Sequence, residues 1–280
     1  MKNVFGTFLW AMLLLSLAWG ELSGFDVMKK ADSRYTGDDG VSRIAMSIVN
    51  SRKQERNREI VLWRKKVDKV NDISHTFILF LTPADVKDTT FLILEKGNGA
   101  DDDQWIYLPA MRKVRKISSS EKDKSFMGTD FSYDDMSNRD IDSYEWTLVK
   151  REEWKGEMCY VVKGVRKDKD KAVYDHSLFW VREKDWIPVK ALMFDKKQPE
   201  RISKVMLVNE LKEIQGIMTP LETVMYTVKP IYKEGRDLEK SFQSKTVLRV
   251  KEVRYNVGLD SSIFSQRNME RPMPYQRYLD

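Results

Sequence analysis

Residues 77–81 read FILFL and residues 220–229 read PLETVMYTVK, and these two stretches together decide the fold. In the second stretch, Val224, Tyr226 and Val228 alternate with their neighbours, as is typical of a strand that has one buried and one wetter face. The first stretch is apolar on both faces and must be covered on both sides. A single antiparallel sheet, strongly curved and capped by short helices, accounts for both kinds of strand.

Strand-like runs fill most of the remaining chain, so the predicted fold class is mainly β. Before them, residues 25–35 carry apolar side chains close to helical spacing, and Gly37 ends this predicted helix. No helix alternates with the strands, which disfavours a parallel sheet with crossover helices. Runs rich in β-branched and aromatic residues, separated by polar turns, predict strands at 41–51, 57–68, 75–82, 90–96, 104–108, 113–117, 145–151, 158–166, 176–183, 187–195, 202–214, 220–229 and 244–256.

The composition excludes several classes of protein and site. Of 280 residues, 49 are Lys or Arg and 43 are Asp or Glu, a charge density too high for a multi-span helical membrane protein. Hydrophobic residues, at 41%, suffice for a sizeable core, which excludes a disordered or low-complexity chain. One cysteine, Cys159, cannot form an internal disulfide, and two histidines disfavour a protein-built metal site. We therefore expect no metal and no cofactor.

The N-terminus has the features of an export signal. Lys2 precedes an uncharged apolar run over residues 4–19, and the small residues Ala18 and Gly20 flank Trp19. The run is shorter than the roughly 20 residues that span a bilayer, and its end fits the pattern that signal peptidase cleaves. We predict a signal peptide at residues 1–20, a single domain at 21–280 and a periplasmic location. An uncleaved membrane anchor is the alternative.

No motif of an enzyme stands out. The sequence contains no phosphate-binding loop and no Gly-x-Ser-x-Gly nucleophile elbow. His75 and His176 begin predicted strands, where a solvated histidine is the ordinary interpretation. Residues 101–103, DDD, lack the spaced oxygen ligands of a calcium loop. We therefore expect no enzymatic activity.

The segment at residues 118–142 is longer than an ordinary loop, and such connections are usually functional or mobile. It also carries bulky apolar side chains that a solvated loop does not need: Phe126, Met127, Phe131, Tyr133 and Met136. These side chains should pack either into the core of the domain or over the mouth of a cavity.

A basic cluster follows the predicted strand at 104–108 and consists of Arg112, Lys113, Arg115 and Lys116. Predicted export argues against nucleic acid as its partner, and an anionic lipid headgroup or membrane surface fits an exported basic patch better. In a regular strand, Lys113 and Arg115 share one face. The alternative is a solvated strand face without a partner.

Two blocks of sequence carry a resemblance to a known family. Residues 103–117, DQWIYLPAMRKVRKI, and residues 125–136, SFMGTDFSYDDM, resemble the outer membrane lipoprotein-sorting protein family, relatives of the LolA-type periplasmic lipoprotein carriers. Residues 80–87, 91–92 and 262–264 add to the agreement, so the resemblance covers essentially all of the mature chain. One position departs from it: LolA-type carriers have an arginine before a proline in the early strands, where this chain has Thr82.

The resemblance implies a strongly curved antiparallel sheet, a half-open β-barrel around an apolar cavity, with short α-helices forming a lid. The implied function is a periplasmic carrier that shelters lipid or lipoprotein acyl chains and moves them toward the outer membrane. Its partners would be those acyl chains, an inner-membrane exporter and an outer-membrane acceptor, with no nucleic acid. A periplasmic lipid-sensing or regulatory module on the same fold is the alternative. An outer-membrane barrel is disfavoured, because charged residues such as Lys204 and Glu210 interrupt the strands.

The expected functional residues fall into two groups. Those of the lipid-binding cavity and lid are Phe77, Leu79, Leu81, Trp105, Tyr107, Leu108, Met111, Phe126, Met127, Phe131, Tyr133 and Met136. Those that would contact a headgroup or membrane are Arg112, Lys113, Arg115 and Lys116.

Overall fold

The computed structural model describes residues 22–97, 99–271 and 274–279, and the predicted signal peptide lies outside them. Its first half contains α1 (Gly24–Asp32), β1 (Asp39–Asn50), β2 (Glu55–Asp68), β3 (Ile73–Thr82), β4 (Thr90–Leu94), β5 (Asp103–Leu108) and β6 (Lys113–Lys116). Its second half contains β7 (Tyr144–Trp154), β8 (Glu157–Arg166), β9 (Tyr174–Arg182), β10 (Pro188–Asp195), β11 (Ile202–Ile214), β12 (Ile217–Val228), α2 (Leu238–Ser241), β13 (Phe242–Tyr255) and α3 (Gln276–Leu279).

All thirteen predicted strands are present, and their ends differ from the predicted ones by no more than three residues. The mainly β fold class is therefore confirmed. The first helix begins near the predicted position but ends at Asp32, three residues before the predicted end. Its start is fixed by a capping box, in which Ser23 and Asp26 bond each other's backbone N–H groups.

One antiparallel sheet contains all thirteen strands, in the order β6-β5-β4-β3-β2-β1-β13-β12-β11-β10-β9-β8-β7. From β1 to β6 the chain meanders outward to one edge. It then crosses to the opposite edge at β7 and meanders back to β13, which pairs with β1 in the middle of the sheet. Because β6 and β7 are both edges, the sheet is not closed into a barrel. We call the connection between these two edges, residues 117–143, the crossover segment.

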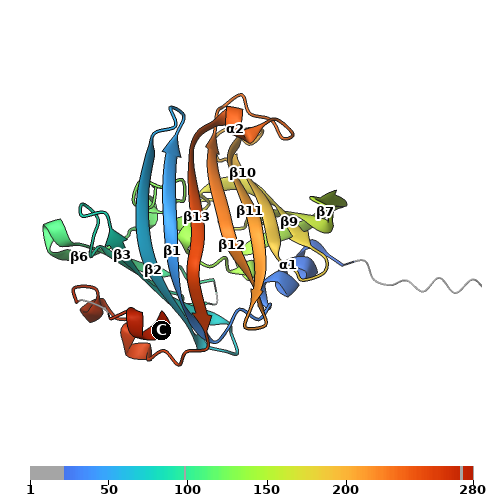
Figure 1. Ribbon diagram of the computed structural model, residues 1–280. Coiled ribbons are helices and arrows are strands. Elements are labelled where there is room, and N and C mark those ends of the chain that lie inside the picture. The colour runs from blue at the N-terminus through green and yellow to red at the C-terminus, as the bar shows by residue number, and fades with distance from the viewer. Residues whose placement is uncertain (1–21, 98, 272–273, 280) are drawn as a thin grey trace, which may run out of the picture.

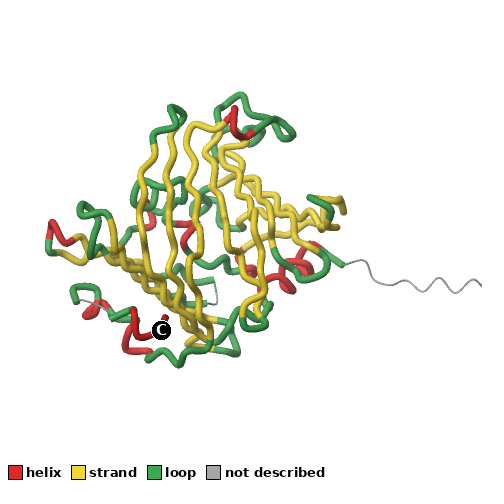
Figure 2. The backbone as a smooth tube through the Cα atoms, viewed as in Figure 1, coloured by secondary structure: helices red, strands yellow, loops and turns green. Residues whose placement is uncertain are grey.

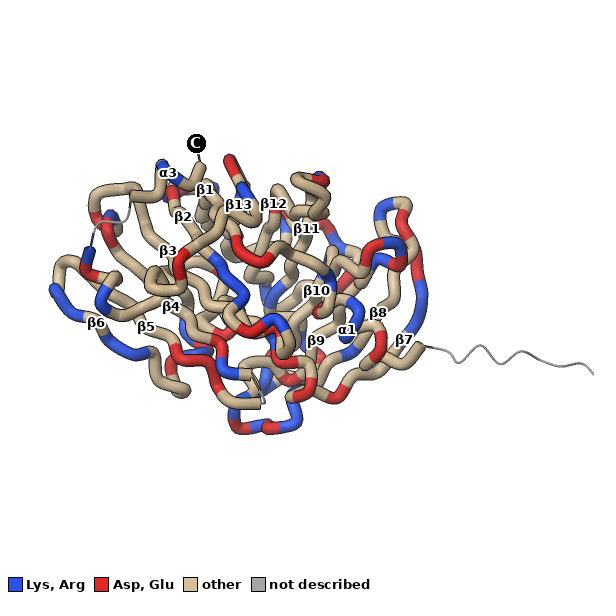
Figure 3. The backbone as a smooth tube through the Cα atoms, turned by 90° about the horizontal axis from the view of Figure 1, so that it is seen from below, with Lys and Arg blue, Asp and Glu red and all other residues tan. Residues whose placement is uncertain are grey.

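The sheet bends into an arch, which Figure 3 shows nearly end-on, with β6 and β7 at its two feet. The crossover segment lies on the inner, concave side, and it contains three 3₁₀ turns, at Ser119–Glu121, Asp134–Met136 and Ile141–Ser143. Figures 1 and 2 show the same arrangement from the convex side, with the crossover segment behind the central strands. Among the described residues, the inner side of the arch is thus covered mostly by irregular chain, together with helix α1.

Helix α1 packs against the inner face near β7. Gly24 makes the close contact possible, since a Cβ at this position would lie 2.6 Å from the backbone nitrogen of Leu148. Val27 and Met28 are buried in the same apolar cluster as Phe131 of the crossover segment. The helix and the crossover segment therefore share one core inside the arch.

The convex face carries separate apolar clusters. Over β1 to β6, the chain that follows β13 covers the sheet, with Leu259, Ile263 and Phe264 packed on Trp63 and Phe77. Over β8 to β13, Tyr232 of the loop before α2 joins a second outer cluster. Both faces of the sheet are thus covered, which explains why strand β3 is apolar on both sides.

Candidate functional site

The inner face of the arch is filled by aromatic side chains of the crossover segment. Phe126 is 1% exposed, and its ring centroid lies 4.9 Å from that of Phe91, 6.0 Å from that of Phe80 and 5.7 Å from that of Tyr133. Aromatic pairs at such distances contribute more stability than the burial of their apolar area alone would give. The crossover segment therefore occupies the inner apolar surface as a bound chain would.

Two carboxylates fasten the crossover segment to the sheet, and the first is Asp130. Its Oδ2 accepts a hydrogen bond of 2.7 Å from Thr246, and its Oδ1 accepts one of 2.6 Å from Thr227 and another from Ser244. Its backbone N–H also donates to Thr246 Oγ1, at 2.9 Å. Asp130 is only 4% exposed, so hydroxyl groups of β12 and β13 replace the water that its charge would otherwise require.

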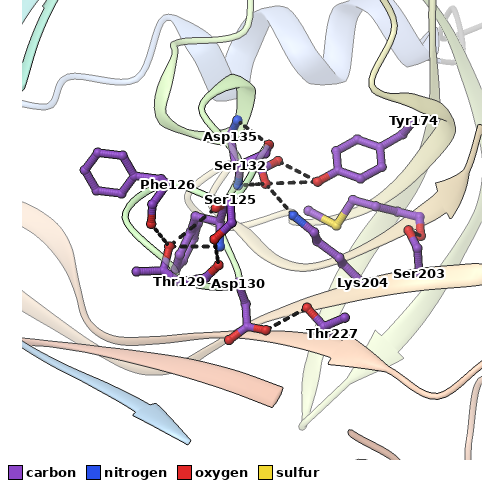
Figure 4. Close-up of polar contacts among 12 residues, drawn as sticks. Ser125, Phe126, Thr129, Asp130, Ser132, Asp135, Tyr174, Ser203, Lys204 and Thr227 are labelled. Carbon is purple, nitrogen blue, oxygen red and sulfur yellow. Dashed lines mark hydrogen bonds and ion pairs between the residues drawn. The ribbon is translucent and has the colours of Figure 1, made fainter. Parts of the chain in front are cut away.

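The second fastening point is Asp135, which Figure 4 shows between Tyr174 and Lys204. The hydroxyl of Tyr174 donates to Asp135 Oδ2 at 2.9 Å, and Lys204 Nζ lies 3.1 Å from the same oxygen. Burial by itself would raise the pKa of Asp135, but the charge of Lys204 and hydrogen bonds from Ser132 lower it overall. Asp135 therefore stays ionised inside the protein and ties the crossover segment to β9 and β11.

The structure divides the predicted cavity and lid residues between the two faces of the sheet. Six of them pack in the inner clusters: Leu108, Phe126, Met127, Phe131, Tyr133 and Met136. Five pack in the outer cluster under the C-terminal chain: Phe77, Leu79, Leu81, Trp105 and Tyr107. Met111 is 64% exposed at the tip of the β5–β6 hairpin.

This division corrects the expectation of one common lining, and strand alternation explains it. Successive side chains of β3 point to opposite faces, so Phe77 and Leu79 lie on the outer face while Ile78 and Phe80 lie inside. The inner residues that sequence reasoning missed include Ile78, Phe80, Phe91, Ile93 and Ile106. Their alternation was visible in the sequence, but nothing in it indicated which face the crossover segment would cover.

Open space remains at one end of the arch, where three cavities adjoin. One, of about 370 Å³, lies between the end of α1, β2 to β4 and the crossover segment. It shares Asp32, Asp72 and Glu95 with a neighbour of about 450 Å³, and Arg34 and Arg64 with another of about 200 Å³. Figure 3 shows charged residues on the segments at this open side of the arch.

The charged groups of these cavities have shifted pKa values. Burial, with added repulsion from Asp72, raises the pKa of Asp32 to about 6. Burial raises the pKa of Glu95 to about 7, although the backbone N–H of Ser74 donates to its carboxylate at 2.7 Å. Burial also lowers the pKa of Arg34. Each shift means that water solvates the charge poorly, so a bound ion or dipole would interact strongly with it.

The predicted basic cluster lies on and beside the edge strand β6. Arg115 pairs with Glu121 at 3.0 Å, and Lys116 pairs with Asp103 at 2.6 Å. Arg112 is outside the strand, at a turn position with φ of 46°. Within the described part of the chain, Arg112 and Lys113 form no ion pair, and both are exposed. Only this half of the cluster is therefore free to meet a partner.

The described residues include no group of three or more His, Cys, Asp and Glu side chains arranged to hold a metal ion. Nor does any helix among them have the length and apolar character that a membrane crossing needs. Cys159 is a free thiol that is fully buried, and burial raises its pKa to about 11. Such a thiol is a poor nucleophile.

Comparison with known proteins gives a family and a fold. A family model described as "-like: Uncharacterized protein" matches residues 72–271. A DUF1329 family protein from Desulfovibrio piger has a crystal structure that is similar at a TM-score of 0.78, with 30% identity over 88% of this chain and 97% of that one. No curated protein matches.

Two further crystal structures are similar over the same region. A putative outer membrane lipoprotein-sorting protein domain from Vibrio parahaemolyticus has a TM-score of 0.77 and 25% identity, over 89% of this chain and 98% of that one. A LolA superfamily protein from Nitrosomonas europaea has a TM-score of 0.64 and 18% identity, over 88% of this chain and 99% of that one. The expected LolA-like fold is therefore confirmed.

Proposed function

This chain belongs to the DUF1329 family, and from that premise we propose that it is a periplasmic carrier that shelters acyl chains of a lipid or lipoprotein inside its arch. The printed description of the similar Vibrio parahaemolyticus domain, a putative outer membrane lipoprotein-sorting protein, supports a carrier. The LolA-like fold supports it as well. In this proposal the protein takes its cargo from one membrane, crosses the periplasm with it and delivers it toward the outer membrane.

One observation carries the proposal: apart from α1 near β7, the inner apolar face is covered by the crossover segment and not by a second sheet or a layer of helices. Exposing an acyl chain to water costs about 0.8 kcal/mol of transfer free energy per methylene. A carrier therefore needs only an apolar surface that can be covered and uncovered. Phe126, Phe131 and Tyr133 cover that surface here. We propose that an acyl chain takes their place when the crossover segment is displaced.

The way in which the crossover segment is held is consistent with displacement. Its two buried carboxylates, Asp130 and Asp135, bond side chains of the sheet, and Gln104 of β5 also donates to the carbonyl of Tyr133 at 2.9 Å. These contacts are made through side chains, so the segment can separate from the sheet while the strands keep their pairing, since the hydrogen bonds between strands do not depend on it. The arch would then open without unfolding.

A disulfide across the first fastening point tests the proposal. Asp130 and Thr246 already touch through the backbone nitrogen of one and the hydroxyl of the other, at 2.9 Å. The variant Asp130→Cys/Thr246→Cys should form a bridge on oxidation that holds the crossover segment on the sheet. The native Cys159 does not interfere, because it is buried and its thiol pKa is raised.

The probe is dansyl-labelled undecanoic acid, whose fluorescence rises in apolar surroundings. We expect the wild-type protein to bind it, the oxidised variant to lose at least nine-tenths of that binding, and the same sample to regain binding after reduction. Equal binding by the oxidised and reduced variant would contradict displacement of the crossover segment. Failure of the wild-type protein to bind the probe would contradict the carrier.

A transfer measurement separates a carrier from a lipid sensor. A carrier should move a labelled lipid from donor to acceptor vesicles faster as its concentration rises. A sensor that binds lipid without releasing it would retain one equivalent and leave the transfer rate unchanged. Mass spectrometry of the protein purified from its native host would identify the cargo in either case.

A further inference from the structure

The cavity of about 370 Å³ at the open end of the arch is lined by charges of both signs together with apolar side chains. Its cationic groups are Arg34, in the loop after α1, and Arg64, on β2. Its carboxylates include Asp32, at the end of α1, and Glu95, just after β4. These groups come from separate elements that the fold brings together, so the cavity is assembled only in the native protein.

The two arginines lack carboxylate partners. Among residues 22–97, 99–271 and 274–279, no Asp or Glu oxygen lies within 4.0 Å of either guanidinium. Arg34 Nη1 donates to the carbonyl of Met218 at 3.1 Å, and Arg64 Nη1 donates to Thr36 Oγ1 at 2.8 Å. The Nε of Arg34 is shielded from solvent and has no hydrogen-bond partner among the described residues. A buried donor left without an acceptor is costly, which indicates that an acceptor belongs there.

The carboxylates of Asp32 and Glu95 are equally without ion-pair partners among the described residues. Glu95 accepts a hydrogen bond from the backbone N–H of Ser74, and the nearby Asp72 pairs with Lys66 at 2.6 Å. Among the described residues, the cationic and anionic side chains thus line one small cavity without forming direct ion pairs with each other. Coulomb attraction in such a place would favour direct pairing, so their separation suits a ligand that carries both charges.

The apolar part of the cavity leads toward the inner apolar surface. Leu62, Ile93 and Met136 line it, and all three also pack in or against the inner cluster that holds Phe126. Met136 belongs to the crossover segment, so a chain that enters past Met136 would run beneath that segment. The charged groups therefore lie at the start of the path proposed for the acyl chain.

We propose that this cavity binds the headgroup of a phosphoethanolamine lipid, with the phosphate between Arg34 and Arg64 and the ammonium at Asp32 and Glu95. The acyl chains then pass Leu62 and Met136 into the arch. This inference rests on the proposed carrier function and adds the class of cargo to it. Guanidinium groups suit phosphate because their N–H groups donate in a planar fork, and the orphaned Nε of Arg34 becomes one of those donors.

The test uses competition, so that binding of the chain and binding of the headgroup are measured separately. A pyrene-labelled alkane reports on the arch alone, since it has no headgroup. It is displaced with one of three lipids that share dihexanoyl chains: the phosphoethanolamine, the phosphoglycerol and the uncharged diacylglycerol. Soluble O-phosphoethanolamine is the fourth competitor, which distinguishes a free phosphate compound from a lipid.

We expect the phosphoethanolamine lipid to displace the alkane at a concentration at least tenfold lower than the diacylglycerol. Arg34→Gln/Arg64→Gln should remove that advantage and leave displacement by the diacylglycerol unchanged. Asp32→Asn/Glu95→Gln should remove only the preference for phosphoethanolamine over phosphoglycerol. The matched control, Arg52→Gln/Arg254→Gln, alters two exposed arginines that line none of the three adjoining cavities and should change nothing.

The outcomes distinguish this inference from the carrier on which it rests. Equal displacement by the three lipids, or an advantage that survives in the Arg34/Arg64 variant, overturns the headgroup site while the carrier stands. Displacement by O-phosphoethanolamine as strong as by the lipid overturns the assignment to a lipid. Absence of alkane binding overturns both. If the glutamine variant fails to fold, Arg34→Lys/Arg64→Lys keeps both charges and should still reduce the advantage, because lysine cannot form the planar fork.

Discussion

The ammonium of Lys204 lies 3.1 Å from the carboxylate of Asp135, and the two side chains are 17% and 3% exposed. This ion pair joins β11 to the crossover segment inside the arch. A buried pair contributes little net stability compared with apolar residues of the same size, but removing one partner leaves an uncompensated charge. The pair thus sets where the crossover segment sits, and it offers a defined place at which to loosen it.

Removal of the cation tests this fastening point. Lys204→Met should lower the free energy of unfolding by roughly 3 kcal/mol, because Asp135 stays buried without its counter-charge. The double variant Lys204→Met/Asp135→Asn should recover part of that loss. Urea denaturation of the two variants provides the measurement. Lys69→Met, which breaks an exposed pair with Asp38, should cost far less, because solvent screens the attraction in that pair. A Lys204→Met loss as small as this control would contradict a buried fastening point.

A substitution of Phe126 tests whether its side chain covers the surface that binds cargo or contacts the cargo itself. Phe126→Leu should lower stability by about 1–2 kcal/mol, since it removes the ring packed on Phe80 and Phe91. If the crossover segment competes with acyl chains, the same variant should bind the dansyl probe more tightly than the wild-type protein.

The control for this prediction lies on the opposite face. Phe264→Leu alters a residue of the C-terminal chain that packs on the outer face and is 5% exposed, and it should reduce stability without changing probe binding. Weaker probe binding by Phe126→Leu would instead make Phe126 part of the cargo-binding surface, as the sequence resemblance suggested.

The strands could be predicted from the sequence because each depends on its own residues. Alternation in 220–229 and the apolar run at 77–81 identify β12 and β3 without any distant contact. The headgroup cavity could not be predicted in this way. Arg34 and Glu95 lie far apart in the chain, and only the fold places both on one cavity. Likewise, Lys204 and Asp135 are separated by 69 residues, and neither carries a local signal of its partner.

The β5–β6 hairpin is a candidate membrane contact, since exposed Met111 lies beside Arg112 and Lys113. Each basic residue near an anionic surface adds about 1 kcal/mol of attraction, which salt screens. Arg112→Glu/Lys113→Glu should therefore reduce cosedimentation with anionic vesicles at least tenfold at low salt. Lys196→Glu/Lys197→Glu makes the same charge change in an exposed loop far along the chain and should have a smaller effect. Equal effects would leave the hairpin as a solvated strand edge.

Glu95 predicts how stability depends on pH. Its pKa is about 7 in the folded protein, raised by burial and by Asp102 and Asp72, while Ser74 and Arg64 oppose the shift. Because this pKa lies above the unfolded value of 4.5, the folded state binds the extra proton, and its stabilising effect is complete below pH 4.5. The effect, roughly 3 kcal/mol, is lost as the pH rises through 7. Glu95→Gln should flatten the decline in urea-unfolding free energy between pH 5 and about 8, whereas the exposed Glu213→Gln should not. If the decline in unfolding free energy persists unchanged in Glu95→Gln, another titrating group causes it. Asp32 would be tested next, because its pKa is raised to about 6 in the same cavity.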